Sequence, residues 1–464
     1  MLINRYEHSK LKNKYLPNSW QSQTELEELE RFLQDNWEQR EIFYEDKTIS
    51  SQQQFLKFLS NGDIKTQNYI GTIAFNGCQL NIFPKIFRED KDDSDTENLS
   101  QSHLMHNLVT WIEYCNKMNY PFISISSELQ DTSNLKELFI TLFVHYVKNA
   151  IDRGLFYRYV EETNDLRLIR GKFNYKDYLI KKLPNGQAEK FSCTYSTFEF
   201  DNLVNRIIKR TCILLLSEVT GKNRNILRRI LTKLEPVSDT ICTPSDCDAI
   251  RLGNMHSNYR VILSMCKIFM LNSNTNYALG NTETFCFLFP SELLFEGFIG
   301  GFMQEVLSPI GGNVKLQRSD MSLIDDIVFK GQSLGNAFTM RHDILVEMND
   351  RIFILDTKYK EVSRFEDNVD EMKELIASEP KQTDIYQVLE YARKRGLNDV
   401  FLLYPMFRYE DAEHGHPIGI SKDEKGNAIN VHFVRVPFVF EENDNSTKKQ
   451  LTDVILSIFG IDAQ

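Results

Sequence analysis

The chain has 464 residues, of which 42% are hydrophobic and 26% are charged, so it is long enough for two or three domains and is not a disordered protein. Its formal net charge of −11 argues against a protein that binds nucleic acid without a partner, because such proteins usually carry an excess of basic residues. No apolar run reaches the roughly 18 residues of a membrane span, and the N-terminal residues lack the apolar stretch of a signal peptide. We therefore expect a soluble cytoplasmic protein with no membrane partner, in which any DNA contact would be local or helped by another protein.

The eight cysteines are expected to be free thiols in a reducing cytoplasm. Cys242 and Cys247 stand five residues apart, with neither a second cysteine pair nor a histidine cluster nearby in the sequence. That spacing is a poor pattern for a zinc site, so no zinc is expected there.

The first 280 residues predict a mixed β and helical domain. Residues 68–87 have the pattern of two short strands around Asn76-Gly77, the dipeptide most typical of a tight hairpin turn. Residues 88–102 are strongly charged and poor in apolar side chains, which predicts an acidic, solvated loop. From about residue 103 to residue 275 the pattern is mostly helical.

Residues 281–464 predict a second domain in which helices and strands alternate. A helix begins near Ser291, which we take as its N-cap. Two strands follow at 342–348 and 351–356, then a helix at 383–396 and two further strands at 399–405 and 430–438. This order predicts an α/β (α+β) fold with a mixed sheet flanked by helices, and a domain boundary near residue 280.

Charged side chains interrupt the two strands that meet at Asn349-Asp350. Asn and Asp both accept positive φ, so this dipeptide suits a two-residue hairpin turn. In that register Asp343 falls opposite Asp356, and directly opposed like charges destabilise a sheet. A divalent cation is the simplest reason to keep two carboxylates there, since Mg²⁺ often takes one or two carboxylates together with water and substrate phosphate. We therefore predict a Mg²⁺ site, with Mn²⁺ as a substitute.

Lys358 lies two residues after Asp356 and so projects from the same face of the strand. An ammonium group there stabilises charge on a phosphate, or helps to position or deprotonate the attacking water. Asp, a gap, and then Asp-x-Lys on adjacent strands is the pattern of the metal-dependent PD-(D/E)xK nucleases, here with His342 in place of the Pro. The alternative is a structural Asp–Lys pair at the end of a strand.

Two helices that flank the strands carry further candidate residues. Gln387 and Tyr391 are i,i+4 neighbours and share one helix face, from which they could hold phosphate or the lysine. Glu296 is a lone acid among apolar residues and is a candidate third metal carboxylate. The alternatives are a polar helix flank for Gln387 and Tyr391, and an exposed face for Glu296.

Six stretches of the sequence follow one another in a specific order, although each alone is degenerate. They are residues 69–86, 154–173, 193–211, 294–302, 342–360 and 384–392. Together they resemble the McrC family, the nuclease subunit of McrBC-type (type IV, modification-dependent) restriction systems.

The resemblance implies a restriction-endonuclease-like C-terminal domain that cuts double-stranded modified DNA, with Asp343, Asp356 and Lys358 matching the nuclease motif. It implies a McrB-like AAA+ GTPase partner that forms a hexameric ring, binds the GTP and recognises methylcytosine. The N-terminal domain would insert into that ring and stimulate GTP hydrolysis, and two complexes could meet to cut both strands. Lys85 matches the family's Pro-Lys-Ile stretch and is expected to be a buried turn lysine without a catalytic role.

Two other functions remain open from the sequence. One is a non-catalytic activator of an AAA+ motor, against which the complete Asp, Asp and Lys set argues. The other is a stand-alone exonuclease that cuts from DNA ends without nucleotide. The sequence contains no GxxxxGK[ST] motif, so the chain itself is not expected to power movement along DNA, which favours a partner-driven machine.

Overall fold

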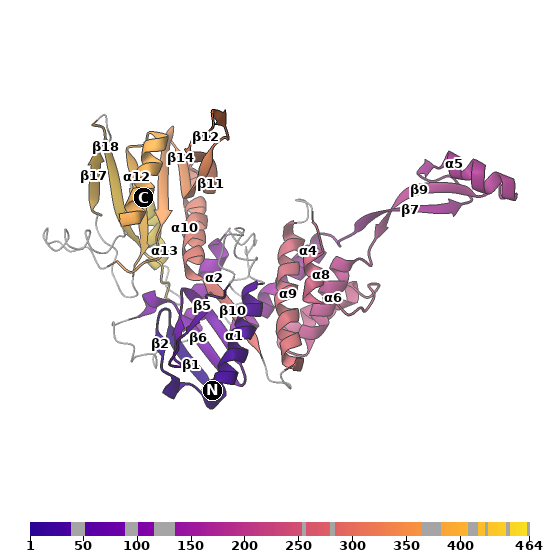
Figure 1. The fold of residues 1–464 in the computed structure, drawn as a ribbon, viewed down its shortest axis with the longest axis horizontal. Coiled ribbons are helices and arrows are strands. Elements are labelled where there is room, and N and C mark those ends of the chain that lie inside the picture. The colour runs from indigo at the N-terminus through magenta and orange to yellow at the C-terminus, as the bar shows by residue number, and fades with distance from the viewer. Residues whose placement is uncertain are drawn as a thin grey trace. The chain divides into compact units, whose positions relative to one another are not determined.

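The computed structural model describes residues 1–38, 52–88, 101–115, 135–252, 257–278, 284–362, 382–406, 416–422, 426–441 and 446–461. They form two compact units (Figure 1): Met1–Leu138 together with Leu279–Gln464, and Phe139–Ala278. The boundary expected near residue 280 lies next to the C-terminal end of the Phe139–Ala278 unit. The chain is nevertheless not divided simply into 1–280 and 281–464, because its first 138 residues belong with its C-terminal part. The acidic loop expected at 88–102 lies largely outside the described residues.

A four-stranded sheet of the first unit explains this division. Its strands lie in the order β1 (Leu2–Tyr6), β6 (Cys78–Phe83), β5 (Tyr69–Phe75) and β10 (Phe285–Pro290). β5 and β6 form the expected hairpin, in which Asn76 and Gly77 have φ angles of 47° and 71°. Because β10 pairs with β5, residues from the C-terminal part of the chain complete an N-terminal sheet.

Smaller elements surround this sheet. Helix α1 (Gln23–Glu38) buries Leu29, Leu33 and Trp37 in the same core as Ile73 and Leu80 of the sheet. The remaining elements of this region are β2 (Lys10–Leu11), β3 (Leu56–Phe58), β4 (Ile64–Thr66), the 3₁₀ helices η1 (Asn13–Tyr15), η2 (Asn18–Trp20) and η4 (Lys85–Phe87), and helix α2 (Gln101–Tyr114).

The C-terminal part of the first unit contains the expected mixed sheet flanked by helices (Figure 1). Its strand order is β11 (Asn313–Ile324), β14 (Ala337–Met348), β15 (Arg351–Thr357), β16 (Asp399–Pro405), β18 (Ala428–Val436) and β17 (Ile418–Lys422). The pairs β15–β16 and β16–β18 are parallel and the others are antiparallel. Helix α10 (Ser291–Leu307) packs on β11 and β14, and helix α12 (Gln382–Arg395) packs on β15, β16 and β18. Helix α13 (Ser446–Ile458) and the small β12 (Val328–Phe329) and β13 (Gln332–Ser333) pair complete this part.

Strands β10, β12, β13 and β17 and helix α13 were not expected from the sequence, and three further details differ from the expectation. β11 was not predicted, because this edge strand mixes charged with apolar residues and its register shifts between Arg318 and Met321. β14 begins at Ala337 rather than at residue 342. Ser291 is not the N-cap of α10, since the cap position is Pro290 and the serine is the first helical residue.

The second unit is a group of helices from which a two-stranded ribbon projects (Figure 1). The ribbon pairs β7 (Arg158–Leu166) with β9 (Phe191–Glu199) over their whole length. The ribbon interrupts the segment expected to be mostly helical. β7 is largely exposed and β9 is buried only at Ser192 and Cys193, so the strands lack the apolar alternation that marks a half-buried strand. The helices are α4 (Leu135–Arg153), which enters the unit at Phe139, α6 (Leu203–Leu216), α7 (Gly221–Lys233), α8 (Pro244–Asp248) and α9 (Ser257–Ala278).

The far end of the ribbon is built from short elements. They are β8 (Lys172–Phe173), which pairs with β9, followed by α5 (Tyr175–Asp177), the π-helical turn η7 (Tyr178–Lys182) and the 3₁₀ turn η8 (Leu183–Asn185). Among the helices that the structure describes, none has the length and apolar content needed to cross a bilayer.

Candidate active site

The β14–β15 hairpin forms as predicted. Asn349 and Asp350 have φ angles of 51° and 59°, the positive values that a type I′ turn requires at both central residues. Met348 pairs with Arg351, and Ile344 pairs with Leu355. The predicted register is therefore confirmed up to the position just before Asp343 and Asp356.

Beyond the last backbone pair of β14 and β15, the side chain of Asp343 bonds to β15. Thr357 donates both its backbone N–H and its hydroxyl to Asp343 Oδ2, each at 2.9 Å. These two bonds tie the carboxylate of β14 to the residue that directly follows Asp356 in β15. The structure thus brings together the two carboxylates that the sequence singled out.

Asp356 is 1% exposed, and its two oxygens have different surroundings. Oδ2 lies 2.5 Å from Lys358 Nζ, while Oδ1 is buried without a hydrogen-bond partner among the described residues. Burial, and then the negative charge of Asp343, raise the pKa of Asp356 to about 7, although Lys358 acts in the opposite direction. An unsatisfied buried carboxylate oxygen is costly, so this site favours a proton or a cation as its occupant.

Lys358 is the start of a hydrogen-bond chain that runs through helix α12. Its Nζ donates to Gln387 Oε1 at 3.2 Å, and Gln387 Nε2 donates to the Tyr391 hydroxyl at 2.8 Å. The Tyr391 hydroxyl in turn donates to the backbone carbonyl of Arg341 in β14 at 2.9 Å. Burial alone would lower the pKa of Lys358, but the adjacent Asp356 outweighs it and the pKa is raised. Gln387 and Tyr391 therefore lie beside Lys358, as the helical spacing predicts.

Glu296 of α10 is linked to β11 and β14 through Gln317. It accepts a long hydrogen bond of 3.4 Å from Gln317 Nε2, and the Gln317 side chain also accepts a bond from Arg341. Gln317 has a φ of 50° and directly precedes the register shift in β11 between Arg318 and Met321. Because no group of three metal-binding side chains forms among the described residues, the role of Glu296 as a third metal carboxylate stays a prediction.

Asp343 and Asp356 are the residues that could hold a metal ion. Across the described ranges, no group of three or more His, Cys, Asp or Glu side chains is arranged for metal binding. Mg²⁺ does not require such a group, because it is commonly bound by one or two carboxylates with waters and substrate phosphates. The two carboxylates, one with an unsatisfied buried oxygen, fit that mode of binding.

Two further residues near the site were missed at the sequence level. Asp384 forms an ion pair with Lys360, and its charge is the last of the causes, after burial, that raise the pKa of Asp356. Its place three residues before Gln387 on the same helix is a signal that could have found it. His342 is fully buried, its ring meets Tyr391 edge-on with 4.5 Å between the centroids, and its Nε2 accepts a bond of 2.9 Å from Arg395 Nε. The histidine that replaces the motif's Pro therefore supports Tyr391.

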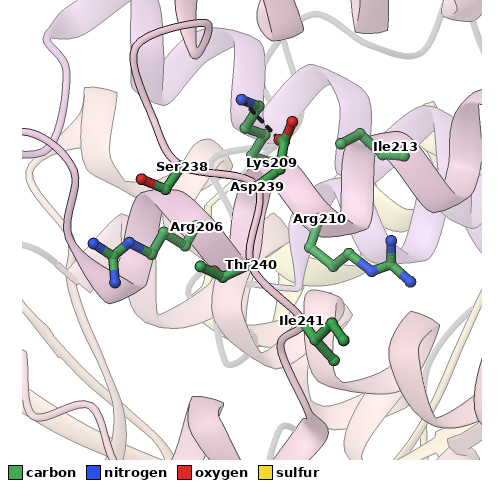
Figure 2. Close-up of a pocket in the computed structure, with 8 residues that line it drawn as sticks. All are labelled: Arg206, Lys209, Arg210, Ile213, Ser238, Asp239, Thr240 and Ile241. Carbon is green, nitrogen blue, oxygen red and sulfur yellow. Dashed lines mark ion pairs between the residues drawn. The ribbon is translucent and has the colours of Figure 1, made fainter.

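A small basic pocket lies in the second unit (Figure 2). Two of its three cations are already paired, Arg206 with Asp201 at 2.7 Å and Lys209 with Asp239 at 2.8 Å. This pairing leaves the pocket little charge to offer an anion. Cys242 and Cys247 of the same unit are buried free thiols, as expected.

Sequence comparison identifies the family of the chain. The sequence model described as "McrBC 5-methylcytosine restriction system component" matches residues 64–405. The curated "Type IV methyl-directed restriction enzyme EcoKMcrBC" of Escherichia coli (strain K12) is 27% identical over 215 residues, which are 45% of this chain and 59% of that protein. The match thus spans less than two thirds of that relative's length.

Structure comparison finds a similar fold. A chain in the refined half-complex from the tetradecameric assembly of Thermococcus gammatolerans McrB AAA+ hexamers with bound McrC matches with a TM-score of 0.56 and 17% identity, over 99% of this chain and 100% of that chain. A chain of the T. gammatolerans McrBC complex covers 66% of this chain and 88% of its own length at 19% identity, but its TM-score of 0.42 is too low to carry an argument.

The family match covers most of the sequence, including the β5–β6 hairpin, the ribbon, and the β14–β15 hairpin with its carboxylates. The match confirms the resemblance to this restriction-system family. The chain belongs to the McrBC 5-methylcytosine restriction system component family.

Proposed function

We propose that this chain is the Mg²⁺-dependent DNA endonuclease subunit of a GTP-driven, methylcytosine-dependent restriction complex. The observation that carries the proposal is the buried Asp356 carboxylate beside Asp343 and Lys358 at the end of β15. Two carboxylates and an ammonium group are the groups that metal-assisted phosphodiester hydrolysis requires. The six-stranded mixed sheet with helices against it supports a restriction-endonuclease-like, PD-(D/E)xK domain.

Each side chain of the site has a distinct role in this reaction. Asp343 and Asp356 would hold the metal, which when bound polarises the scissile phosphate and activates a water. The adjacent Asp356 outweighs burial and raises the pKa of Lys358, which favours the ammonium form in the metal-free chain. As an ammonium group, Lys358 stabilises negative charge on the phosphate. Gln387 holds Nζ in place, and Tyr391 anchors Gln387 to the backbone of β14.

The partner in this proposal is a hexameric AAA+ GTPase that binds the GTP and recognises the modified DNA. The T. gammatolerans assembly pairs McrB AAA+ hexamers with bound McrC, which supports such a partner here. We assign the docking and GTPase-stimulating segment to the ribbon of the second unit. Leu168 and Ile180, near the far end of the ribbon, are 81% and 61% exposed. A lone two-stranded ribbon is marginally stable in water, and exposed apolar groups of this kind mark interaction sites.

The test is cleavage of methylated and unmethylated plasmid with Mg²⁺ or Mn²⁺, with and without the AAA+ partner and GTP. Wild type is compared with Asp356→Ala and Lys358→Ala. We expect cutting to require methylation, partner and GTP, and each substitution to lower the rate at least about 100-fold while GTP hydrolysis stays stimulated.

Other results would identify other functions. Undiminished cutting by both variants would show that the hairpin site is structural. Stimulated GTP hydrolysis without any cutting by the wild type would indicate a non-catalytic activator. Cutting from DNA ends without nucleotide would indicate a stand-alone exonuclease.

A further inference from the structure

We infer that Glu7 and Lys85 are positioning residues for the candidate active site, which they serve by anchoring the backbone that follows Lys358. The inference rests on the proposed nuclease function. Glu7 directly follows β1, and Lys85 begins η4 just after β6, so both come from the N-terminal part of the first unit. Neither residue was assigned a role in the chemistry from the sequence.

The Glu7 carboxylate is a junction of four chain segments. It is 0% exposed and accepts hydrogen bonds from three donors. The backbone N–H of Lys85 and the hydroxyl of Tyr359 each reach Oε2 at 2.9 Å, and the hydroxyl of Ser291 reaches Oε1. The end of β1, the start of η4, the first residue of α10 and the segment after β15 therefore meet at one side chain.

Lys85 holds Tyr359 at two more points. Its Nζ donates to the Tyr359 backbone carbonyl at 3.0 Å and lies 4.7 Å from the centroid of the Tyr359 ring. The second contact is a cation–π interaction. Together with Glu7, Lys85 fixes the hydroxyl, the ring and the backbone of Tyr359. The Pro-Lys-Ile stretch therefore contributes more than the turn lysine expected from the sequence.

Tyr359 is the neighbour of Lys358, and this connects the anchor to the site. In an extended chain, successive side chains point to opposite sides. Lys358 accordingly meets Asp356 and Gln387, while Tyr359 meets Glu7 and Lys85. The backbone N–H of Lys358 still bonds Leu403 of β16 at 2.8 Å, but β15 itself ends at Thr357. The anchored tyrosine thus determines where the chain carrying Lys358 leaves the sheet.

The chemistry of the junction favours positioning over simple stability. Burial raises the pKa of Glu7, and the bonds from Ser291 and Lys85 oppose that effect. A buried ionisable group of this kind usually adds less stability than apolar side chains of similar volume, but its hydrogen bonds require one geometry. In a catalytic site, displacement by about 1 Å can cost on the order of 100-fold in rate.

The test compares full-length variants by two independent measurements. Lys85→Met removes the ammonium group, Lys85→Arg retains a cation, and Tyr359→Phe removes only the hydroxyl. Lys10→Met is the matched control, because Lys10 forms an ion pair with Asp63 at 2.9 Å in the small N-terminal sheet. The measurements are amide hydrogen exchange of residues 358–362, and kcat and KM for plasmid cleavage with the partner and GTP.

We expect Lys85→Met to raise exchange at residues 358–362 selectively and to lower kcat about 10- to 100-fold with KM nearly unchanged. Stimulation of the partner's GTPase should be retained. Lys85→Arg should restore most of both signals, Tyr359→Phe should show a smaller change of the same kind, and Lys10→Met should show neither. If Lys85→Met does not fold, Tyr359→Phe against Lys10→Met decides the question.

Unchanged exchange in Lys85→Met, or raised exchange with normal kcat, overturns the positioning role. A wild-type protein that never cuts DNA overturns the proposed function instead. The exchange measurement distinguishes these failures, because it does not depend on cleavage.

Discussion

Asp356 is a deeply buried carboxyl group of the candidate active site. It is 1% exposed, and burial together with the charge of Asp343 raises its pKa to about 7. A carboxylate that binds a metal must be ionised, so a cation has to displace this proton. The same burial that favours a cation therefore makes its binding depend on pH near neutrality.

We predict that ionisation of Asp356 destabilises the metal-free protein as the pH rises. The folded-state pKa of about 7 lies above the ordinary value of 3.8, so the folded chain holds the proton more tightly than the unfolded chain. The resulting stabilisation is complete below the ordinary pKa and is lost as the pH rises through the folded value. One pKa unit corresponds to about 1.4 kcal/mol, so the loss should amount to a few kcal/mol.

Thermal unfolding in EDTA between pH 4 and pH 8 measures this effect. The Tm of Asp356→Asn should lack the wild type's decline, and Mg²⁺ should raise the Tm of the wild type but not that of the variant. Parallel curves of Tm against pH for the two proteins would show that folding does not raise the pKa of Asp356.

Helix α12 carries two Gln–Tyr pairs with the same spacing but different surroundings. Gln387 and Tyr391 connect Lys358 to β14. Gln382 and Tyr386 form the equivalent i,i+4 hydrogen bond on the exposed side of the same helix. The Gln382–Tyr386 pair is therefore a control, within the same helix, for the effect of removing a glutamine that does not contact Lys358.

We predict that Gln387→Ala lowers kcat about 10-fold or more with little change in KM. A hydrogen bond to a charged group is worth about 1.5–3 kcal/mol, and about 1.4 kcal/mol corresponds to tenfold in rate. Gln382→Ala removes the same side chain from the same helix and should leave kcat unchanged. Equal losses in the two variants would indicate a general effect on the helix rather than on Lys358.

At the scale of the whole chain, the second unit is a continuous insertion in the sequence between the two parts of the first unit. Phe139–Ala278 forms its own unit, while residues on either side share the sheet that contains β5 and β10. In our proposal the inserted unit contacts the partner through its ribbon, and the first unit cuts DNA. The two tasks should therefore be separable by mutation.

We predict that Leu168→Asp combined with Ile180→Asp abolishes stimulation of the partner's GTPase. Both side chains are largely exposed, so the substitutions should change stability by no more than about 0.5 kcal/mol each. Ile241→Asp is the control, because Ile241 is 89% exposed in the same unit but outside the ribbon. GTP hydrolysis assays should show a loss in the double variant alone, and retained stimulation there would reject the ribbon as the docking segment.

The sequence alone determined the features that depend on near neighbours in the chain. The Asn349-Asp350 turn determined the register that places Asp343 beside Asp356, because a two-residue turn leaves a single pairing for the strands that it joins. The step of two residues placed Lys358 with Asp356, and helical spacing placed Gln387 with Tyr391. Local geometry is sufficient for each of these.

Only the tertiary structure decided the contacts between distant segments. To this group belong the pairing of β10 with β5, the junction at Glu7, the support of Tyr391 by His342 and the contact of Gln317 with Glu296. No periodicity in the chain encodes them, because they depend on how separately formed elements pack. The residues that carry the proposed chemistry were therefore visible in the sequence, whereas those that hold them in place became visible only in the fold.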